Sequence, residues 1–186
     1  MPPRESALMI YPERGWQWLF YRLPFWLWRM GARPLMRFRM SILTTRGRKS
    51  GLPRHTMLEF AVLDDRAYLG AGWGDRSHWV KNLLADPRVV LESGLGIQRG
   101  RAVRVTDPDT MRRLYPEMSK SPVWMQYCSA WGVNGADPDD VAAKADQLWT
   151  FRIDPDDSNP DLTQQPLDLW WVSVSLTGLA LFAWSL

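Results

Sequence analysis

Short strand-like runs, each closed by turn residues, fill the middle of this chain and constrain its fold more than any other feature. Six such runs, rich in β-branched and aromatic side chains, are expected between Met40 and Ile153. Most follow one another through short turns, including Asp64-Asp65 and residues 93–96, so neighbouring strands would pair antiparallel. This order predicts a small six-stranded antiparallel β-barrel, mainly β within the α+β class, rather than a parallel sheet. The expected strands are 40–45, 54–63, 66–71, 88–92, 97–106 and 148–153.

Helices are expected between these hairpins. Ser77 fits the N-cap of a helix that ends before Pro87. A second helical region covers 107–131, with expected breaks at Pro116 and Pro122 because proline removes a helical hydrogen bond. A third short helix is expected at 137–147, so the barrel would carry inserted helices.

The chain of 186 residues, about one domain in length, divides into four segments of different composition. The N-terminal segment mixes tryptophan and leucine at helical spacing with arginine, as an amphipathic helix does. This helix would either pack on the barrel or lie at a membrane interface, with tryptophan at headgroup depth and arginine reaching anionic lipid. The expected segments are 1–36 for the amphipathic helix, 37–154 for the barrel, 155–168 for an acidic linker and 169–186 for an apolar tail.

The tail contains no charged residue over its eighteen positions. That length is at the lower edge of what crosses a hydrocarbon core about 30 Å thick, and Trp170, Trp171 and Trp184 lie near its ends, where interfacial aromatics belong. Its four hydroxyl residues lower its hydrophobicity. Two interpretations stay open, a membrane anchor and a tail that packs on the domain or on a second subunit. Because the N-terminus lacks the pattern of a secretory signal, we expect a cytoplasmic protein, associated through these segments with the cytoplasmic face of the membrane.

Basic residues are concentrated in one stretch. The chain has 23 basic and 20 acidic residues, yet nine basic residues and no acidic one fall within 22–54. Such a local field can hold an anionic ligand or an anionic surface. Within it, the loop 46–53 combines Gly47 and Gly51, which allow close backbone approach, with arginine and lysine, which bind phosphate or carboxylate. A nucleotide tail, RNA and a lipid headgroup all fit this loop, and a solvated basic turn is the alternative.

Metal and triad chemistry find no support in the sequence. A single cysteine, Cys128, and two histidines, His55 and His78, are too few for a zinc site built from these residues. No nucleophilic or acidic partner is identifiable for any of the three. We therefore expect no metal site and structural roles for these residues.

Two ordered blocks resemble a known family. The first is Leu-Thr-Thr-Arg-Gly-Arg-Lys-Ser-Gly-Leu-Pro-Arg at 43–54, followed by a hydrophobic strand. The second, at 70–89, is a glycine-containing loop that leads into a Trp-x-x-Asn-Leu helix and an Asp-Pro-x-Val strand start. Together they are similar to the deazaflavin-dependent nitroreductase and quinone reductase family, which uses coenzyme F420, an 8-hydroxy-5-deazaflavin. The resemblance covers about 36–154 and implies a split β-barrel of the flavin-reductase type.

The resemblance also implies a set of cofactor-binding residues. The first block would bind the phosphate and glutamyl tail of coenzyme F420, and 71–74 would pass close to the deazaflavin or its phosphate. Similar proteins often carry a Ser-Lys pair where this chain has Gly72-Trp73. The implied cofactor-binding residues are Thr45, Arg48, Lys49, Ser50, Gly51, Arg54, Ala71, Gly72, Trp73 and Gly74.

On the substrate side, the resemblance places aromatic side chains from the helical region before the last strand. Trp124 and Tyr127, with Trp131 close by, match that placement, and their spacing puts them along one helix face. Where relatives place an aromatic on the second strand, this chain has Glu59, either a proton donor or the partner of a nearby arginine. Tyr127 and Glu59 are therefore the candidates for proton transfer.

The implied activity is transfer of a hydride from C5 of reduced coenzyme F420 to an electron-poor acceptor, a quinone or a nitro compound. A quinone is the first expectation, because the apolar tail and the tryptophan-arginine segment would bring the barrel to a lipid-soluble substrate. The alternatives are the same barrel with flavin mononucleotide or haem, and a non-catalytic nucleic-acid-binding module, in which tryptophan stacks on bases. Nucleic acid is not the expected partner, and the oligomeric state is left open.

Overall fold

The computed structural model describes residues 23, 25–28, 30, 39–158 and 174. The expected N-terminal helix, acidic linker and apolar tail lie largely outside the described residues, so their boundaries stay predictions. Among the residues that the structure describes, no helix combines the length and the apolarity that a membrane crossing requires.

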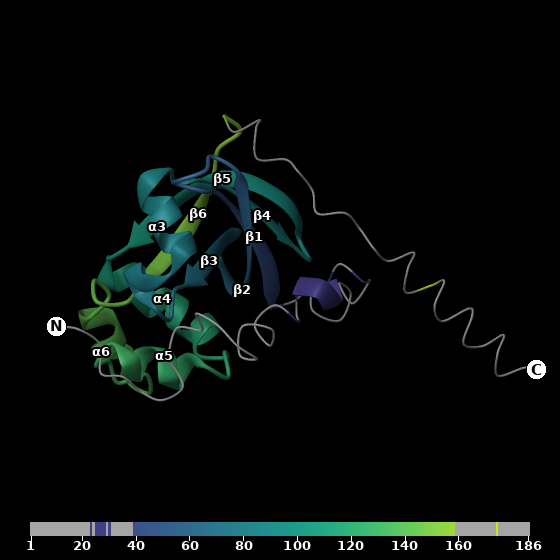
Figure 1. Cartoon of the computed structure of the whole chain (residues 1–186). Helices are drawn as coiled ribbons and strands as arrows, with labels where there is room; N and C mark the ends of the chain where they lie inside the picture. Colours follow the sequence, from purple (N-terminus) through teal and green to yellow (C-terminus); the bar gives the residue numbers. More distant parts are fainter. Residues whose placement is uncertain (1–22, 24, 29, 31–38, 159–173, 175–186) are drawn as a thin grey trace, which may run out of the picture.

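Six antiparallel strands form a closed barrel (Figure 1), which confirms the expected fold. Their order around the barrel is β1-β2-β3-β6-β5-β4, and β4 closes the ring by pairing with β1. Each strand begins and ends within two residues of its expected bounds. The strands are β1 (Met40–Arg46), β2 (Pro53–Leu63), β3 (Arg66–Gly70), β4 (Arg88–Ser93), β5 (Gly96–Val105) and β6 (Thr150–Pro155).

The tight turn between β2 and β3 has the left-handed backbone that a two-residue hairpin needs. Asp64 and Asp65 have φ values of 51° and 57°, which aspartate tolerates better than most residues. The Asp64 carboxylate also accepts a hydrogen bond of 2.6 Å from Arg113. This contact attaches the hairpin to the helix α4 (Pro108–Met118), which contains Arg113.

Along the chain the helices lie between the strands, as expected, but the bounds of two helices differ from the prediction. The expected break at Pro116 is wrong: α4 continues to Met118, since Ser119 N–H still reaches Tyr115 O at 2.9 Å. The expected break at Pro122 is confirmed, because this residue lies between α4 and α5. The last helix ends at Ala143 rather than 147, because Lys144 leaves the helical conformation. The helical elements are η2 (Gly74–Arg76), α3 (His78–Ala85), α4 (Pro108–Met118), α5 (Trp124–Ala130) and α6 (Pro138–Ala143).

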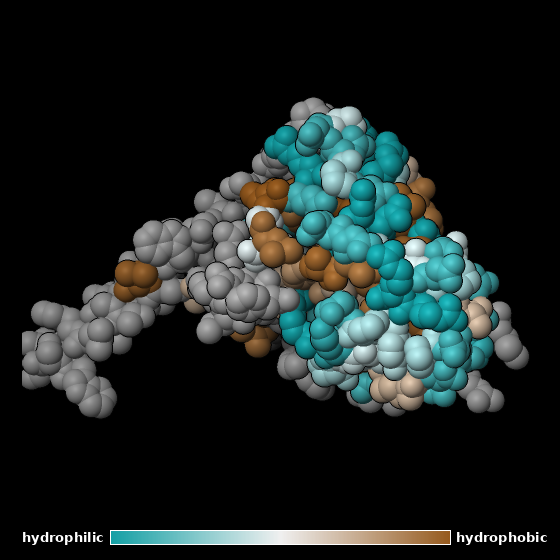
Figure 2. Space-filling view, turned by 180° about the vertical axis from the view of Figure 1, so that it is seen from behind, coloured by the Kyte–Doolittle hydropathy of each residue, from teal (hydrophilic) through white to brown (hydrophobic). Residues whose placement is uncertain are grey.

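Two buried clusters hold the layers together. One fills the barrel and includes Leu69 and Ile153, against which α3 packs Trp79 and Leu83. The other lies between the barrel and the group α4, α5 and α6, which gathers at one end of the barrel in Figure 1. Trp149, which falls within the expected closing strand 148–153, instead precedes β6 and is half-buried. Seen from behind in Figure 2, the surface is mainly hydrophilic, with hydrophobic residues gathered in patches between hydrophilic areas.

Candidate functional site

A cationic cavity of about 400 Å³ lies where the loop between β1 and β2 meets the start of α3. Among the residues that the structure describes, no carboxylate lines this cavity, whereas two arginines, a lysine and two histidines do. Such a donor set suits an anion with several oxygens. The lining residues are Gly47, Arg48, Lys49, Ser50, Arg54, His55, Thr56, His78, Trp79 and Asn82.

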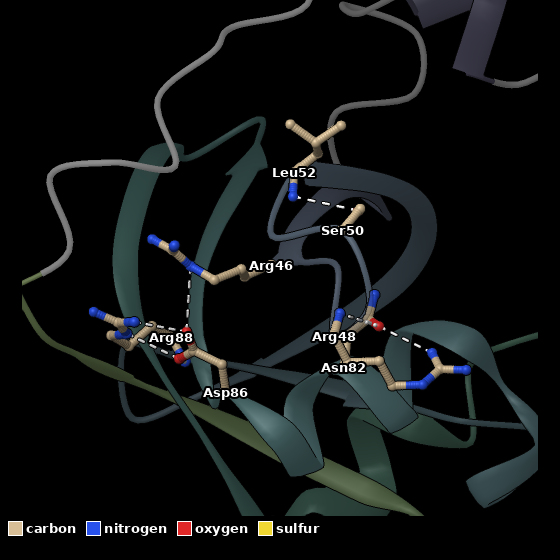
Figure 3. A network of polar contacts seen from close by, with 7 residues as sticks. All are labelled: Arg46, Arg48, Ser50, Leu52, Asn82, Asp86 and Arg88. Atoms are coloured by element: carbon tan, nitrogen blue, oxygen red, sulfur yellow. Dashed lines mark hydrogen bonds and ion pairs between the residues drawn. The ribbon is translucent and has the colours of Figure 1, made fainter.

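The loop between these strands, residues 47–52, is named the basic loop below. Its ends are joined by a hydrogen bond of 2.8 Å from Gly47 N–H to Leu52 O. Gly51 has a φ of 69°, in the left-handed region that favours glycine. Ser50 Oγ accepts hydrogen bonds from Leu52 N–H at 3.4 Å (Figure 3) and from Arg54 at 3.3 Å. The loop is therefore a closed turn that presents its basic side chains outward.

Asn82 of α3 attaches the basic loop to the helix (Figure 3). Its Oδ1 accepts from the backbone N–H of Arg48 at 3.2 Å and from the Arg48 guanidinium at 3.0 Å. Its Nδ2 donates to Thr45 Oγ1 at 3.1 Å. The guanidinium also donates to His78 O at 3.4 Å. Arg48 is therefore held over the first turn of α3 by amide and carbonyl oxygens.

Arg46 points to the other side of the loop, toward Asp86 (Figure 3). Its Nε lies 3.4 Å from the Asp86 carboxylate, which also accepts two hydrogen bonds from Arg88 at 2.7 and 2.8 Å. The Arg88 hydrogen bonds, aided by the charge of Arg46, hold the pKa of Asp86 below its usual value against the opposing effect of burial. Arg46 is thus ion-paired and does not line the cationic cavity.

A second, largely apolar cavity of about 290 Å³ continues along the same strand. Residues 54–56 of β2 line the cationic cavity, and residues 57–61 line the apolar one. The two cavities therefore follow one another along β2 without a gap in the sequence. The apolar cavity is lined by Arg39, Met57, Leu58, Glu59, Phe60, Ala61, Gly70, Gly72, Trp73, Glu117, Met118, Ser121, Val123, Trp124, Gln126 and Tyr127.

Glu59 joins the barrel to the helical layer across the apolar cavity. Its carboxylate accepts a hydrogen bond from the hydroxyl of Ser121, in the connection between α4 and α5. Of the two roles expected for Glu59, the pairing with an arginine is not seen among the described residues, where Glu59 forms no ion pair. A carboxylate in a largely apolar wall can accept a proton, and its protonated form can deliver one.

Tyr127 has its ring in the cavity wall and its hydroxyl in the protein interior. The hydroxyl lies 3.3 Å from Thr150 Oγ1, and both residues are buried. Burial raises the pKa of the Tyr127 hydroxyl well above its usual value, so it stays protonated at neutral pH. Trp124 packs at 5.9 Å from the Tyr127 ring and donates its Nε1–H to Gly135 O at 2.8 Å.

The structure divides the expected site residues into three groups. Four of them line the cationic cavity, and five others line the apolar one. The other five line neither cavity: Thr45, Ala71 and Gly74 are buried, Gly51 is exposed, and Trp131 lies at the C-cap of α5. The first group is Arg48, Lys49, Ser50 and Arg54, and the second is Glu59, Gly72, Trp73, Trp124 and Tyr127.

Trp131, expected beside the substrate, lies elsewhere. Helix α5 ends at Ala130, and Trp131 is its C-cap with φ of −103° and ψ of 8°. The helical spacing that predicted one common face therefore stops before this residue. Its ring packs 6.4 Å from Trp149, away from the cavity lining.

Several polar residues that line the two cavities were not predicted as site residues, among them Asn82, Ser121, His55 and His78. Asn82 belongs to the second sequence block, but no role was predicted for it. Nothing in the sequence pattern indicated a role for Ser121. His55 and His78 line the cationic cavity; His55 Nδ1 lies 2.9 Å from Thr44 Oγ1. Within the described ranges, no group of three or more His, Cys, Asp or Glu side chains could hold a metal ion.

The family model described as F420H(2)-dependent quinone reductase matches residues 29–131, more than half of the chain. Every residue that lines either cavity falls within that range. No curated protein matches the chain.

Several solved structures are similar to this chain. A conserved hypothetical protein from Mycobacterium tuberculosis is 24% identical over 65% of this chain and 75% of its own, with a TM-score of 0.44. An F420-H2 dependent reductase is 20% identical over 63% of this chain and 95% of its own, with a TM-score of 0.45. A heme binding protein from Mycobacterium smegmatis is 14% identical over 68% of this chain and 50% of its own, with a TM-score of 0.47.

Proposed function

The chain belongs to the F420H(2)-dependent quinone reductase family, and we propose that it reduces a quinone with its two neighbouring cavities, one for the coenzyme tail and one for the reacting rings. The protein is an oxidoreductase, and its cofactor is coenzyme F420. This family membership sets aside the flavin, haem and nucleic-acid alternatives. The observation that carries the proposal is that consecutive stretches of β2 line a cationic and an apolar cavity.

The cationic cavity fits the anionic end of the coenzyme. Arg48, Lys49 and Arg54 supply three positive charges, and no carboxylate among the described lining residues competes for them. The guanidinium groups can grip phosphate or carboxylate oxygens in pairs, while the lysine adds a mobile charge. We assign these three residues, with Ser50, to the phosphate and glutamyl tail.

The apolar cavity fits flat ring systems. Trp73, Trp124 and Tyr127 offer aromatic walls, and Gly72 leaves room beside Trp73. A volume of about 290 Å³ is at the small end of ligand cavities. We assign this cavity to the reacting end of the coenzyme and to the acceptor at its opening.

Reduced coenzyme F420, when bound, supplies a hydride. The quinone then needs one proton at its oxygen to become a hydroquinone. We assign the delivery of this proton to Glu59, which sits in the cavity wall and is oriented by Ser121. Tyr127, whose hydroxyl is bonded inward to Thr150, serves as a wall that excludes water.

The test of the coenzyme site is a fluorescence titration of the purified protein with coenzyme F420. The double variant Arg48→Ala/Lys49→Ala should bind about 100-fold more weakly, since it loses two charge-assisted contacts. Arg99→Ala/Arg101→Ala on β5 removes the same charge outside both cavities and should bind like the wild type. Absence of binding by the wild type, or equal affinity of the two double variants, would overturn the proposal.

The test of Glu59 is the rate of quinone reduction by Glu59→Gln. General acids contribute about 100-fold or more, so kcat should fall by that order while coenzyme affinity stays near the wild-type value. Glu92→Gln on β4 is the matched control and should keep full activity. The same assay with a nitro compound determines whether that acceptor class is also reduced.

We also propose that the protein works at the cytoplasmic face of a membrane. Exposed apolar side chains support this: Trp26 and Leu27 belong to the N-terminal segment, and Val123 lies in the wall of the apolar cavity. Co-sedimentation of the full chain with anionic vesicles tests the proposal. Recovery of all protein in the supernatant would contradict it.

A further inference from the structure

Two nearby arginines, Arg46 and Arg48, contact different kinds of polar group on and just after α3, one a carboxylate and the other an amide. Asn82 holds Arg48 through an amide oxygen, and Asp86, four positions later at the helix C-cap, holds Arg46 through a carboxylate. The two contacts lie on opposite sides of the basic loop (Figure 3). Of these two arginines, Arg48 lines the cationic cavity and Arg46 does not.

Asn82 is built into the fold as a fixed point. Its residue is 5% exposed, and it contacts β1 through Thr45 and the basic loop through both the backbone and the side chain of Arg48. An amide buried with its donor and acceptor both used has one preferred orientation. Arg48 is therefore held in place before any ligand binds. This reduces the loss of side-chain conformational entropy when the ligand binds.

We infer that Asn82 is a positioning residue for the anionic ligand, and that it must be an amide because it orients Arg48 without cancelling its charge. A carboxylate of the same shape would form an ion pair with Arg48, as Asp86 does with Arg46. That pair would lower the affinity of the cavity for anions. The inference rests on the proposed function in taking the tail of coenzyme F420 as the ligand.

The experiment compares three variants in the same fluorescence titration. Asn82→Ala removes the orienting contacts and should weaken coenzyme binding about tenfold. Asn82→Asp keeps the shape but adds a charge, and should weaken binding about 100-fold. Asp86→Asn replaces a carboxylate by an amide one turn away, and it should leave the affinity for coenzyme F420 unchanged. A purely structural role would give the reverse order for Asn82, because alanine leaves a cavity and aspartate does not.

Two further measurements separate the possible outcomes. In an Arg48→Ala background, Asn82→Asp should add little to the loss of affinity, because it acts through Arg48. Calorimetric titration with inorganic pyrophosphate repeats the comparison without the coenzyme. Failure of the wild type to bind coenzyme F420 would overturn the proposed function, whereas equal pyrophosphate affinity of Asn82→Asp and the wild type would overturn the inference about Asn82.

Discussion

Gly74 offers the sharpest test of how the wall of the apolar cavity is built. It follows Trp73, has a φ of 51°, and a Cβ added to it would lie 2.5 Å from Trp131 Cζ2. Alanine there meets two costs: about 1–2 kcal/mol for the left-handed backbone and about 1–3 kcal/mol for forcing an indole ring to move. We expect Gly74→Ala to lower the free energy of unfolding by about 2–5 kcal/mol, or the Tm by about 4–20 °C.

Gly51 supplies the matched control for this prediction. Its φ is 69°, but a Cβ there would meet nothing within 4 Å. Gly51→Ala should therefore show the backbone cost alone, about 1–2 kcal/mol. Urea and thermal unfolding of both variants measure the difference. Equal losses would show that the contact with Trp131 is not what requires glycine at 74.

Two other predictions concern titratable groups. Asp154 bridges Arg66 and Arg152 at 2.7 Å each, and the Arg152 hydrogen bond lowers the pKa of Asp154. A carboxyl with a lowered folded pKa stabilises the fold above its unfolded pKa, so Asp154→Asn should be less stable than the wild type at neutral pH. The difference in stability between Asp154→Asn and the wild type should narrow as pH falls below about 4. A difference in Tm that stays constant from pH 7 to pH 3 would contradict this. Burial raises the pKa of the Cys128 thiol to about 12, so a thiol reagent at pH 8 should modify only unfolded protein, and fast labelling of the native chain would be the contrary result.

The strands could be predicted closely because their signals are local. The Asp64-Asp65 turn and the glycine at 96 fix where chains reverse, and the register of each hairpin follows from its turn. The continuation of α4 through Pro116 could not be seen in this way. Met111 and Leu114 are fully buried in the second cluster, and their packing keeps the helix in place despite one missing hydrogen bond.

The site could be predicted for its charges but not for its geometry. The concentration of basic residues indicated that the basic loop binds anions, but it did not distinguish Arg46 from Arg48, and only the family resemblance selected Arg48. Their difference depends on Asn82 and Asp86, more than 30 positions away, and no local pattern reports such contacts. The prediction that Trp131 shares a helix face with Trp124 and Tyr127 failed for a related reason, since helical spacing applies only as far as the helix itself extends.

The placement of both cavities on β2 sets a length requirement for the ligand. From Arg54 to Glu59 the strand advances five residues, or about 16 Å at roughly 3.3 Å each. A molecule that engages both cavities must therefore separate its negative charge from its reacting ring by a comparable span. Compounds whose charged group adjoins the ring can occupy one cavity at a time, and would act as partial competitors rather than as replacements for the coenzyme.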